Sequence, residues 1–159
     1  SLESPDHLLG TGGALRAALP LLGPEFLILY GDSYLPAPFA PPTKAFMASN
    51  AHSLMTAYRN ADTHEPSNIE FRNGMIILYS KRHHTQDMEY IDYGLGGLRR
   101  EAIENYPPDT AFDLADVYEK LSREGRLLGV EVYDRFYEIG SPAGLAETVR
   151  HLTGKGKTQ

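Results

Sequence analysis

A glycine-rich stretch near the N-terminus and an aspartate further along the chain carry the residue types of a phosphate site. Residues 10–13 read Gly-Thr-Gly-Gly, and Asp32 follows the apolar run 26–30. In an open α/β sheet, ligands bind beyond the carboxyl ends of the strands. Only glycine lets the backbone approach a flat or anionic ligand closely, and Mg²⁺ prefers one or two carboxylates together with substrate phosphates. This pattern predicts a site for a phosphate compound carried with a metal ion.

Two residues far from Asp32 in the sequence complete the candidate chemistry. Glu138 ends a second short strand, so the two acids could meet across the sheet and hold one metal ion that offsets phosphate charge. Lys81 follows a hairpin, where a lysine acts as a point charge for a phosphate. Structural alternatives stay open for each of them: a turn or helix-cap aspartate, a surface glutamate, and a solvated basic cluster with Arg82.

The glycine-rich stretch has its own alternative. It is not the dinucleotide-binding fingerprint, because the third glycine of that motif would stand at Leu15 and no convincing strand precedes it. A tight turn that enters a helix explains the stretch equally well.

The elements that must position these residues alternate between strand and helix, which predicts an α/β fold. Asn73-Gly74 predicts a hairpin, because both turn residues need positive φ. Asp113, Ser141 and Thr43 are expected to cap helices. The continuous apolar run of the first strand is typical of a strand inside a parallel sheet. The expected helices are 14–22, 43–49, 99–105, 113–124 and 141–152, and the expected strands are 25–30, 53–59, 69–72, 75–79, 90–98, 127–133 and 136–139.

Composition sets wider limits on function. The 159 residues suffice for one domain, expected over 1–153 with a disordered tail at 154–159. A net charge of −6 argues against broad nucleic-acid binding, which needs a basic face. The chain has no cysteine and no apolar run long enough for a membrane helix. A soluble cytoplasmic protein is the expectation.

Four stretches, in order and at consistent separations, resemble the sugar-1-phosphate nucleotidyltransferases: 9–15, 29–35, 87–95 and 136–145. The resemblance covers the C-terminal two-thirds of the family's fold. Within the family, the chain most resembles the mannose-1-phosphate and heptose-1-phosphate guanylyltransferase-like branch. It implies a Rossmann-like three-layer α/β/α sandwich with a mixed sheet and an inserted β-hairpin. It also implies transfer of a nucleoside monophosphate from a nucleoside triphosphate to a sugar 1-phosphate, with Mg²⁺ as cofactor and pyrophosphate as the second product.

The resemblance assigns roles residue by residue. Asp32 matches a catalytic, metal-binding aspartate, Glu138 a second metal-binding acid, and Lys81 a lysine that contacts the sugar phosphate. The positions that match substrate-binding segments are Gly10, Gly12 and Gly13 for the nucleotide, and Tyr93 and Gly94 for the sugar.

The resemblance also implies an N-terminally incomplete fold. Family members open with a strand and a glycine-rich loop whose arginine and lysine hold the triphosphate, and residues 1–9 do not match that region. The chain alone is therefore expected to be inactive or very poorly active. An exposed sheet edge would remain, which invites pairing with another copy as a homodimer. A non-catalytic nucleotide-sugar or phosphate-binding module is the alternative function.

Overall fold

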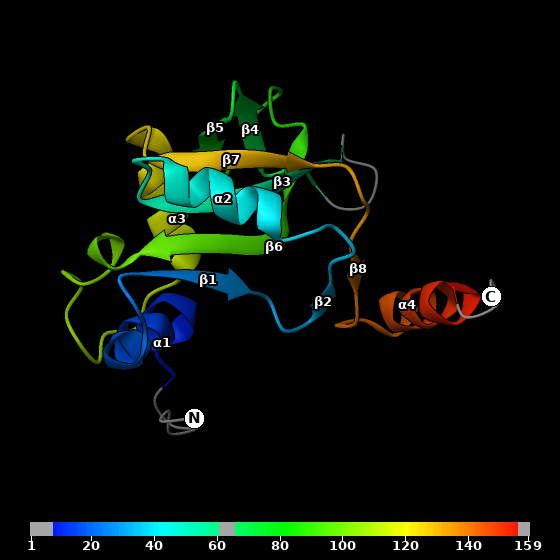
Figure 1. Cartoon of the computed structure of the whole chain (residues 1–159), viewed down its shortest axis with the longest axis horizontal. Helices are drawn as coiled ribbons and strands as arrows, with labels where there is room; N and C mark the ends of the chain where they lie inside the picture. The colour runs from blue at the N-terminus through cyan, green and yellow to red at the C-terminus, as the bar shows by residue number, and fades with distance from the viewer. Residues whose placement is uncertain (1–7, 61–65, 156–159) are drawn as a thin grey trace.

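The computed structural model describes residues 8–60 and 66–155, which form one mixed six-stranded sheet between helices (Figure 1). The sheet order is β1-β6-β3-β7-β5-β4, with β3 and β7 parallel and the other neighbours antiparallel. Its strands are β1 (Glu25–Leu29), β3 (Ser53–Arg59), β4 (Ile69–Arg72), β5 (Met75–Tyr79), β6 (Tyr90–Arg99) and β7 (Leu127–Val132). A separate two-stranded sheet joins β2 (Ser33–Tyr34) to β8 (Tyr137–Glu138).

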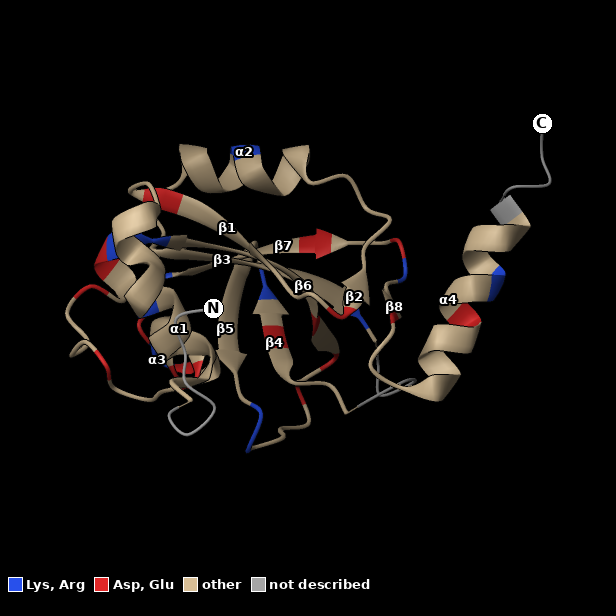
Figure 2. Cartoon of the chain, turned by 90° about the horizontal axis from the view of Figure 1, so that it is seen from below, with Lys and Arg blue, Asp and Glu red and all other residues tan. Residues whose placement is uncertain are grey.

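Helices lie on both faces of the main sheet, which confirms the three-layer arrangement. Figure 2 shows α2 over one face and α1 and α3 over the other, with α4 standing apart at the end of β8. The α-helices of the described residues are α1 (Gly10–Ala18), α2 (Ala40–Ala48), α3 (Leu114–Arg123) and α4 (Pro142–Lys155). Short 3₁₀ helices cover Leu19–Leu21 and Arg100–Ala102. None of the described helices has the length and apolar character needed to span a membrane.

Glycines in β6 make room for side chains from both helical layers. A Cβ on Gly97 would lie 3.0 Å from the ring of Phe46 on α2, and one on Gly96 would lie 2.7 Å from the hydroxyl oxygen of Tyr118 on α3. These two aromatic side chains are fully buried. The glycines that lower the strand propensity of this segment therefore allow close packing above and below the sheet.

Several local predictions are confirmed. Asn73 and Gly74 have φ values of 51° and 78° at the β4–β5 turn. The apolar residues expected to face the core from α3 are all buried: Leu114, Val117, Tyr118 and Leu121. Ser141 and Pro142 begin α4 as predicted, with the Gly144 amide donating to the Ser141 hydroxyl at 3.0 Å.

Other predictions are wrong at their boundaries. Helix α2 begins at Ala40, before Thr43, because Pro41 and Pro42 are tolerated in a first helical turn. The Thr43 hydroxyl does not cap the helix but donates to the Phe39 carbonyl at 2.7 Å. At the other end of the chain, α4 continues into the expected tail as far as Lys155. Residues 156–159, the rest of that predicted tail, lie outside the described residues.

The largest topological difference concerns β1. Its apolar sequence predicts a strand inside a parallel sheet, but β1 lies at one edge and is antiparallel to β6. No other described strand pairs with it.

The cap of α3 supports a stability prediction. The Asp113 carboxylate accepts bonds from the Ala115 amide at 3.0 Å and the Thr11 hydroxyl at 2.8 Å, so it joins α3 to α1. The Ala115 amide is the main cause that lowers the pKa of Asp113. Asp113→Ala is expected to reduce the free energy of unfolding by about 1 kcal/mol in urea titrations at pH 7. Asp113→Asn keeps a capping oxygen and is the control; an equal loss in both variants would contradict the capping role.

Candidate functional site

Asp32 and Glu138 are brought together by the small β2–β8 sheet. Ser33 pairs with Glu138 across this sheet, and the Ile139 amide donates to the Asp32 carbonyl at 2.8 Å. A Cβ built on Gly140 would lie 3.4 Å from Glu138 Oε2 and 3.8 Å from Asp32 Oδ2. Both carboxylates therefore border the same small space, which the absent side chain of Gly140 leaves open.

This donor set fits a hard divalent cation. Two carboxylates suit Mg²⁺, which completes its coordination with water and phosphate oxygens. Among residues 8–60 and 66–155, no cluster of three or more His, Asp or Glu side chains is arranged to hold a metal ion by itself. A cation at Asp32 and Glu138 would accordingly depend on a phosphate substrate for further ligands.

Glu138 already has structural partners at the start of α4. Its carboxylate accepts the Ser141 hydroxyl at 2.5 Å and the Ser141 amide at 2.9 Å. These two hydrogen bonds lower the pKa of Glu138, and the bond from the Ser141 hydroxyl has the larger effect. The carboxylate also packs against Gly144, where a Cβ would collide with it. Glu138 therefore holds the N-terminus of α4 and would offer a metal only its remaining lone pairs.

Replacing Ser141 tests this coupling. Because the folded pKa of Glu138 is lower than the unfolded value of about 4.3, its contribution to stability is present above that pH and is lost as pH falls through the folded pKa. Ser141→Ala should raise the pKa of Glu138 in carboxyl NMR titrations. It should also cost about 1 kcal/mol through the lost helix cap.

The stability difference between wild type and Ser141→Ala should become smaller as the pH falls through the lowered folded pKa of Glu138, because below that pKa the carboxylate is protonated in both proteins. Ser141→Thr retains the hydroxyl and serves as the control. A stability difference that does not change with pH would contradict the Glu138–Ser141 coupling.

The glycine-rich stretch is part of a helix, so the predicted turn is wrong. Gly12 and Gly13 lie inside α1 and are buried, and both amides point to the Phe112 carbonyl, at 3.0 and 3.3 Å. A Cβ on Gly13 would lie 2.6 Å from the Thr110 carbonyl oxygen, and one on Gly10 would lie 2.7 Å from the Phe112 oxygen. These glycines are needed for contact with the chain's own 110–113 segment. Their assignment to nucleotide binding remains a prediction.

The predicted sugar segment lies in β6, where its two residues have internal partners. Tyr93 is buried, and its hydroxyl accepts the Ala37 amide at 3.2 Å. Gly94 has a φ of 99°, and its carbonyl accepts the Tyr30 amide at 3.1 Å. Both residues therefore shape the strand next to Tyr30, and their contact with a sugar remains a prediction.

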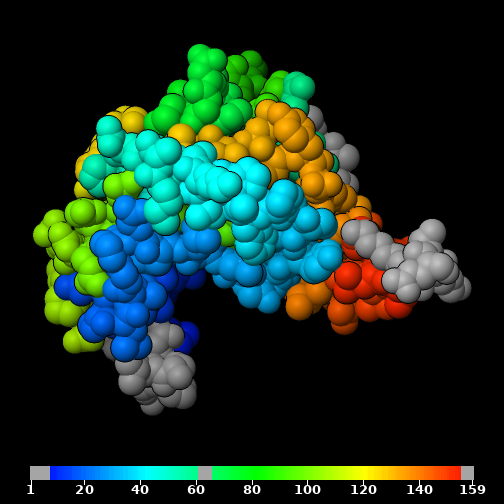
Figure 3. All heavy atoms as spheres, viewed as in Figure 1, coloured from blue at the N-terminus to red at the C-terminus, as the bar shows by residue number. Residues whose placement is uncertain are grey.

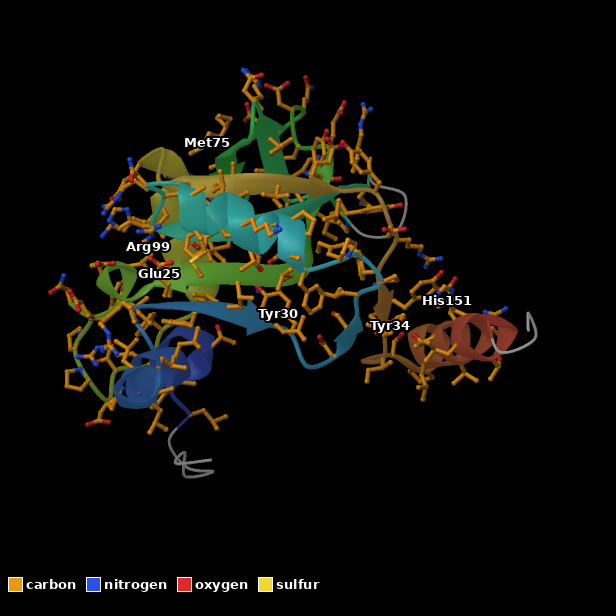
Figure 4. All side chains as sticks on the ribbon, viewed as in Figure 1. Glu25, Tyr30, Tyr34, Met75, Arg99 and His151 are labelled. Atoms are coloured by element: carbon orange, nitrogen blue, oxygen red, sulfur yellow. The ribbon has the colours of Figure 1, made fainter. Side chains whose placement is uncertain are left out.

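Asp92 is a candidate residue of the functional site that sequence reasoning did not identify. Its carboxylate accepts the Tyr30 hydroxyl at 2.9 Å and the Gly94 amide at 3.0 Å. Burial raises the pKa of Asp92, while these bonds and the charge of Lys81 act in the opposite direction. An acidic residue inside an apolar strand was the available signal. Figure 4 labels Tyr30 at the end of β1, and Asp32 follows it by two residues, so the Tyr30–Asp92 bond attaches β6 to the segment that carries Asp32.

Lys81 lies in the loop after β5 and is exposed. Its positive charge favours the ionised form of Asp92 and so acts to lower the pKa of that residue. The same charge also acts to lower the pKa of Asp113, although the hydrogen bonds to the Asp113 carboxylate contribute more. Lys81 also lines a pocket of about 340 Å³ that includes Asn68, Arg82 and His83. The structure thus places Lys81 within electrostatic range of Asp92.

Comparisons with known proteins identify the fold. No protein-family model matches the sequence, and no curated protein sequence matches it. Among solved structures, the inositol-1-phosphate CTP transferase of T. maritima matches 94% of this chain and 63% of its own, at 21% identity and a TM-score of 0.72. HddC from Yersinia pseudotuberculosis matches 91% of this chain and 63% of its own, at 19% identity and a TM-score of 0.69.

A UDP-glucose pyrophosphorylase from Acinetobacter baumanii matches 95% of this chain and 59% of its own, at 14% identity and a TM-score of 0.76. The chain therefore has the Rossmann-like mixed α/β fold of these enzymes. It spans about 60% of their length.

Proposed function

We propose that this chain is part of a nucleotidyltransferase that joins a nucleoside monophosphate to a sugar 1-phosphate. The observation that carries the proposal is the approach of Asp32 and Glu138 to one space beside Gly140, in a fold shared with proteins named as an inositol-1-phosphate CTP transferase and a UDP-glucose pyrophosphorylase. In the reaction, a sugar-phosphate oxygen attacks the α-phosphorus of a nucleoside triphosphate. A new phosphorus–oxygen bond forms, the α–β bridging bond breaks, and pyrophosphate leaves.

The side chains of this chain would mainly position substrates and balance charge. Asp32 and Glu138 would hold Mg²⁺, which offsets phosphate charge when bound. Lys81 would contact the sugar phosphate, the segment at Tyr93 and Gly94 would lie along the sugar, and Gly10, Gly12 and Gly13 would lie near the nucleotide. Such positioning accounts for most of the catalysis expected in phosphoryl transfer.

Guanosine triphosphate and a manno-configured sugar 1-phosphate are the proposed substrates. They follow from the sequence resemblance, and HddC from Yersinia pseudotuberculosis, one of the similar structures, was solved as a complex with GMP-PN. The other similar enzymes are named for cytidine and uridine nucleotides, so the base is the first specificity to measure.

The test is pyrophosphate release by the complete reading frame, with Mg²⁺ and a panel of nucleoside triphosphates and sugar 1-phosphates. Turnover that requires both substrates supports the proposal. Absence of turnover with every pair would contradict it. If nucleotide sugars still bound, the result would favour a non-catalytic nucleotide-sugar or phosphate-binding module.

A further inference from the structure

The corner of the chain that carries Asp32 has few neighbours of its own. β1 ends at Leu29 and β2 begins at Ser33, and Gly31 and Asp32 between them are exposed. Within the described part of the chain, a Cβ built on Gly31 would meet nothing within 4 Å beyond the adjacent residues. In Figure 3 the surface is hollowed below β1 and β2, between α1 and α4, and the segment that joins the two strands borders this hollow. The position of the Asp32 carboxylate therefore depends on the residues on either side of the corner.

On its downstream side, the corner is joined to the other acid of the site. Ser33 pairs with Glu138, and the Asp32 carbonyl accepts the Ile139 amide at 2.8 Å. These contacts place the two acids relative to each other, but β2 and β8 form a two-stranded sheet that is separate from the main sheet. Two strands alone are marginally stable in water. The corner therefore needs a further contact with the main sheet to be held in place.

Tyr30 supplies this contact on the upstream side. Its amide donates to the Gly94 carbonyl at 3.1 Å, and its hydroxyl donates to Asp92 Oδ2 at 2.9 Å. Gly94 has a φ of 99°, and a Cβ there would lie 3.4 Å from the Tyr30 ring and 3.7 Å from the Cβ of Ser33. Strand β6 thus lies directly against the segment on both sides of Asp32.

Asp92 is itself held in place within β6. Its second oxygen, Oδ1, accepts the Gly94 amide at 3.0 Å, and its own amide donates to Asn68 Oδ1 at 3.3 Å. The carboxylate therefore cannot turn to follow Tyr30 without breaking another bond. A hydrogen bond to an ionised acceptor is also stronger than one between neutral groups. The Tyr30–Asp92 bond is thus a firm link between a fixed strand and the Asp32 corner.

We propose that Tyr30 and Asp92 are positioning residues for Asp32. Their hydrogen bond fixes the corner between β1 and β2, so that the Asp32 carboxylate meets that of Glu138 beside Gly140. A functional site needs its ligating groups within about 0.5 Å of their working positions, which requires supporting residues behind them. The consequence for cation binding rests on the proposed function, whereas the consequence for the order of the corner does not.

Tyr30→Phe, which removes only the hydroxyl, is the main test and is made in the complete reading frame. Mn²⁺ is the probe for the divalent cation, because carboxylate ligands suit both Mn²⁺ and Mg²⁺. Its binding is followed by electron paramagnetic resonance in the presence of mannose 1-phosphate, whose phosphate supplies further oxygen ligands. The variant should bind Mn²⁺ about tenfold more weakly, as is typical when a residue that supports a metal ligand is lost.

The order of the corner is measured without any metal ion. Hydrogen–deuterium exchange at the Ile139 amide, which donates to the Asp32 carbonyl, should be about fivefold faster or more in Tyr30→Phe, with little change in the interior strand β3. Unchanged exchange at Ile139 together with unchanged Mn²⁺ binding would overturn the proposal.

Tyr34→Phe is the matched control. Tyr34 follows Asp32 by two residues, just as Tyr30 precedes it by two, and the Tyr34 hydroxyl has no hydrogen bond within the described part of the chain. Its Mn²⁺ binding and Ile139 exchange should stay within about twofold of wild type. Equal weakening of Mn²⁺ binding in both variants would show that the Asp92 partner is not the cause, and the positioning role would be lost.

A double-mutant cycle tests whether the two side chains act as a pair. Asp92→Asn keeps an acceptor of the same shape but removes its charge, so the bond from Tyr30 becomes weaker. Tyr30→Phe should therefore weaken Mn²⁺ binding by a smaller factor in the Asp92→Asn background than in wild type. The same factor in both backgrounds would mean that the side chains act independently, contrary to the proposal.

Steady-state kinetics separate positioning from contact with substrate. In Tyr30→Phe the Mg²⁺ concentration for half-maximal pyrophosphate release should rise about tenfold. The kcat at saturating Mg²⁺ and the KM for the sugar 1-phosphate should stay within about threefold of wild type. A raised KM for the sugar 1-phosphate with an unchanged Mg²⁺ requirement would assign the pair to substrate binding and overturn the positioning role.

The same measurements distinguish this inference from the proposed function. A wild-type protein without pyrophosphate release, whose Mn²⁺ binding is weakened by Tyr30→Phe, would support the positioning role and contradict only the proposed function. Pyrophosphate release together with equal Mn²⁺ binding by wild type and Tyr30→Phe would contradict only the positioning role.

Discussion

Asp32→Asn is expected to lower pyrophosphate release by the complete reading frame about a thousandfold. Asparagine has the same shape but lacks the negative charge that would hold a divalent cation against phosphate oxygens. The Ile139 amide donates to the Asp32 carbonyl and so helps to join the β2 and β8 segments, and this backbone hydrogen bond does not depend on the Asp32 side chain. The fold should therefore be retained, which circular dichroism and the melting temperature would verify. Rates are measured at saturating Mg²⁺ with the best substrate pair.

Asp134→Asn is the matched control, because Asp134 is an exposed acid in the loop before β8. It removes the same charge from the protein and should leave the rate within about twofold, as expected for a substitution away from the site. A near-normal rate for Asp32→Asn would show that the cation site lies elsewhere. An equal loss in both variants would point to net charge as the cause.

Phe46→Ala is expected to have the largest effect on stability, a loss of about 3–5 kcal/mol in the free energy of unfolding. Phe46 is fully buried between α2 and β6, where Gly97 leaves space for its ring. The Arg99 guanidinium lies 5.4 Å from the ring centroid and would lose this contact as well. Alanine leaves a cavity that the rigid strand beneath cannot close.

Met47→Ala provides the control for Phe46→Ala, since Met47 is the next residue on α2 and is half-exposed. In urea or thermal unfolding, the free energy of unfolding of Met47→Ala should lie within about 0.5 kcal/mol of the wild-type value. A loss below about 1 kcal/mol for Phe46→Ala would contradict the packing of α2 on the sheet.

Local signals in the sequence were sufficient for much of the fold. Asp113 marks the start of α3, and Asn73-Gly74 marks the hairpin, because caps and tight turns depend on a few consecutive residues. The same holds for the start of α4 at Ser141 and Pro142. The alternation of these elements also predicts the α/β class correctly.

The glycine-rich stretch shows where local reasoning fails. A turn and a helix were both compatible with these residues, and the partner that decides between them is Phe112, about a hundred residues away in sequence. Asp92 was missed for a similar reason. Its partner Tyr30 directly follows the neighbouring strand β1 and is 62 residues away in the sequence, so no local pattern indicates that the two side chains meet.

By itself, the sequence determined the identity and order of most helices and strands, and it drew attention to Asp32 and Glu138 as acids at strand ends. The tertiary structure decided that β2 and β8 place these carboxylates beside Gly140, that the glycines pack inside α1, and that β1 lies at an open edge. The difference is physical. Caps and turns are stabilised by neighbours along the chain, whereas strand order and shared sites depend on contacts between residues that only the folded chain brings together.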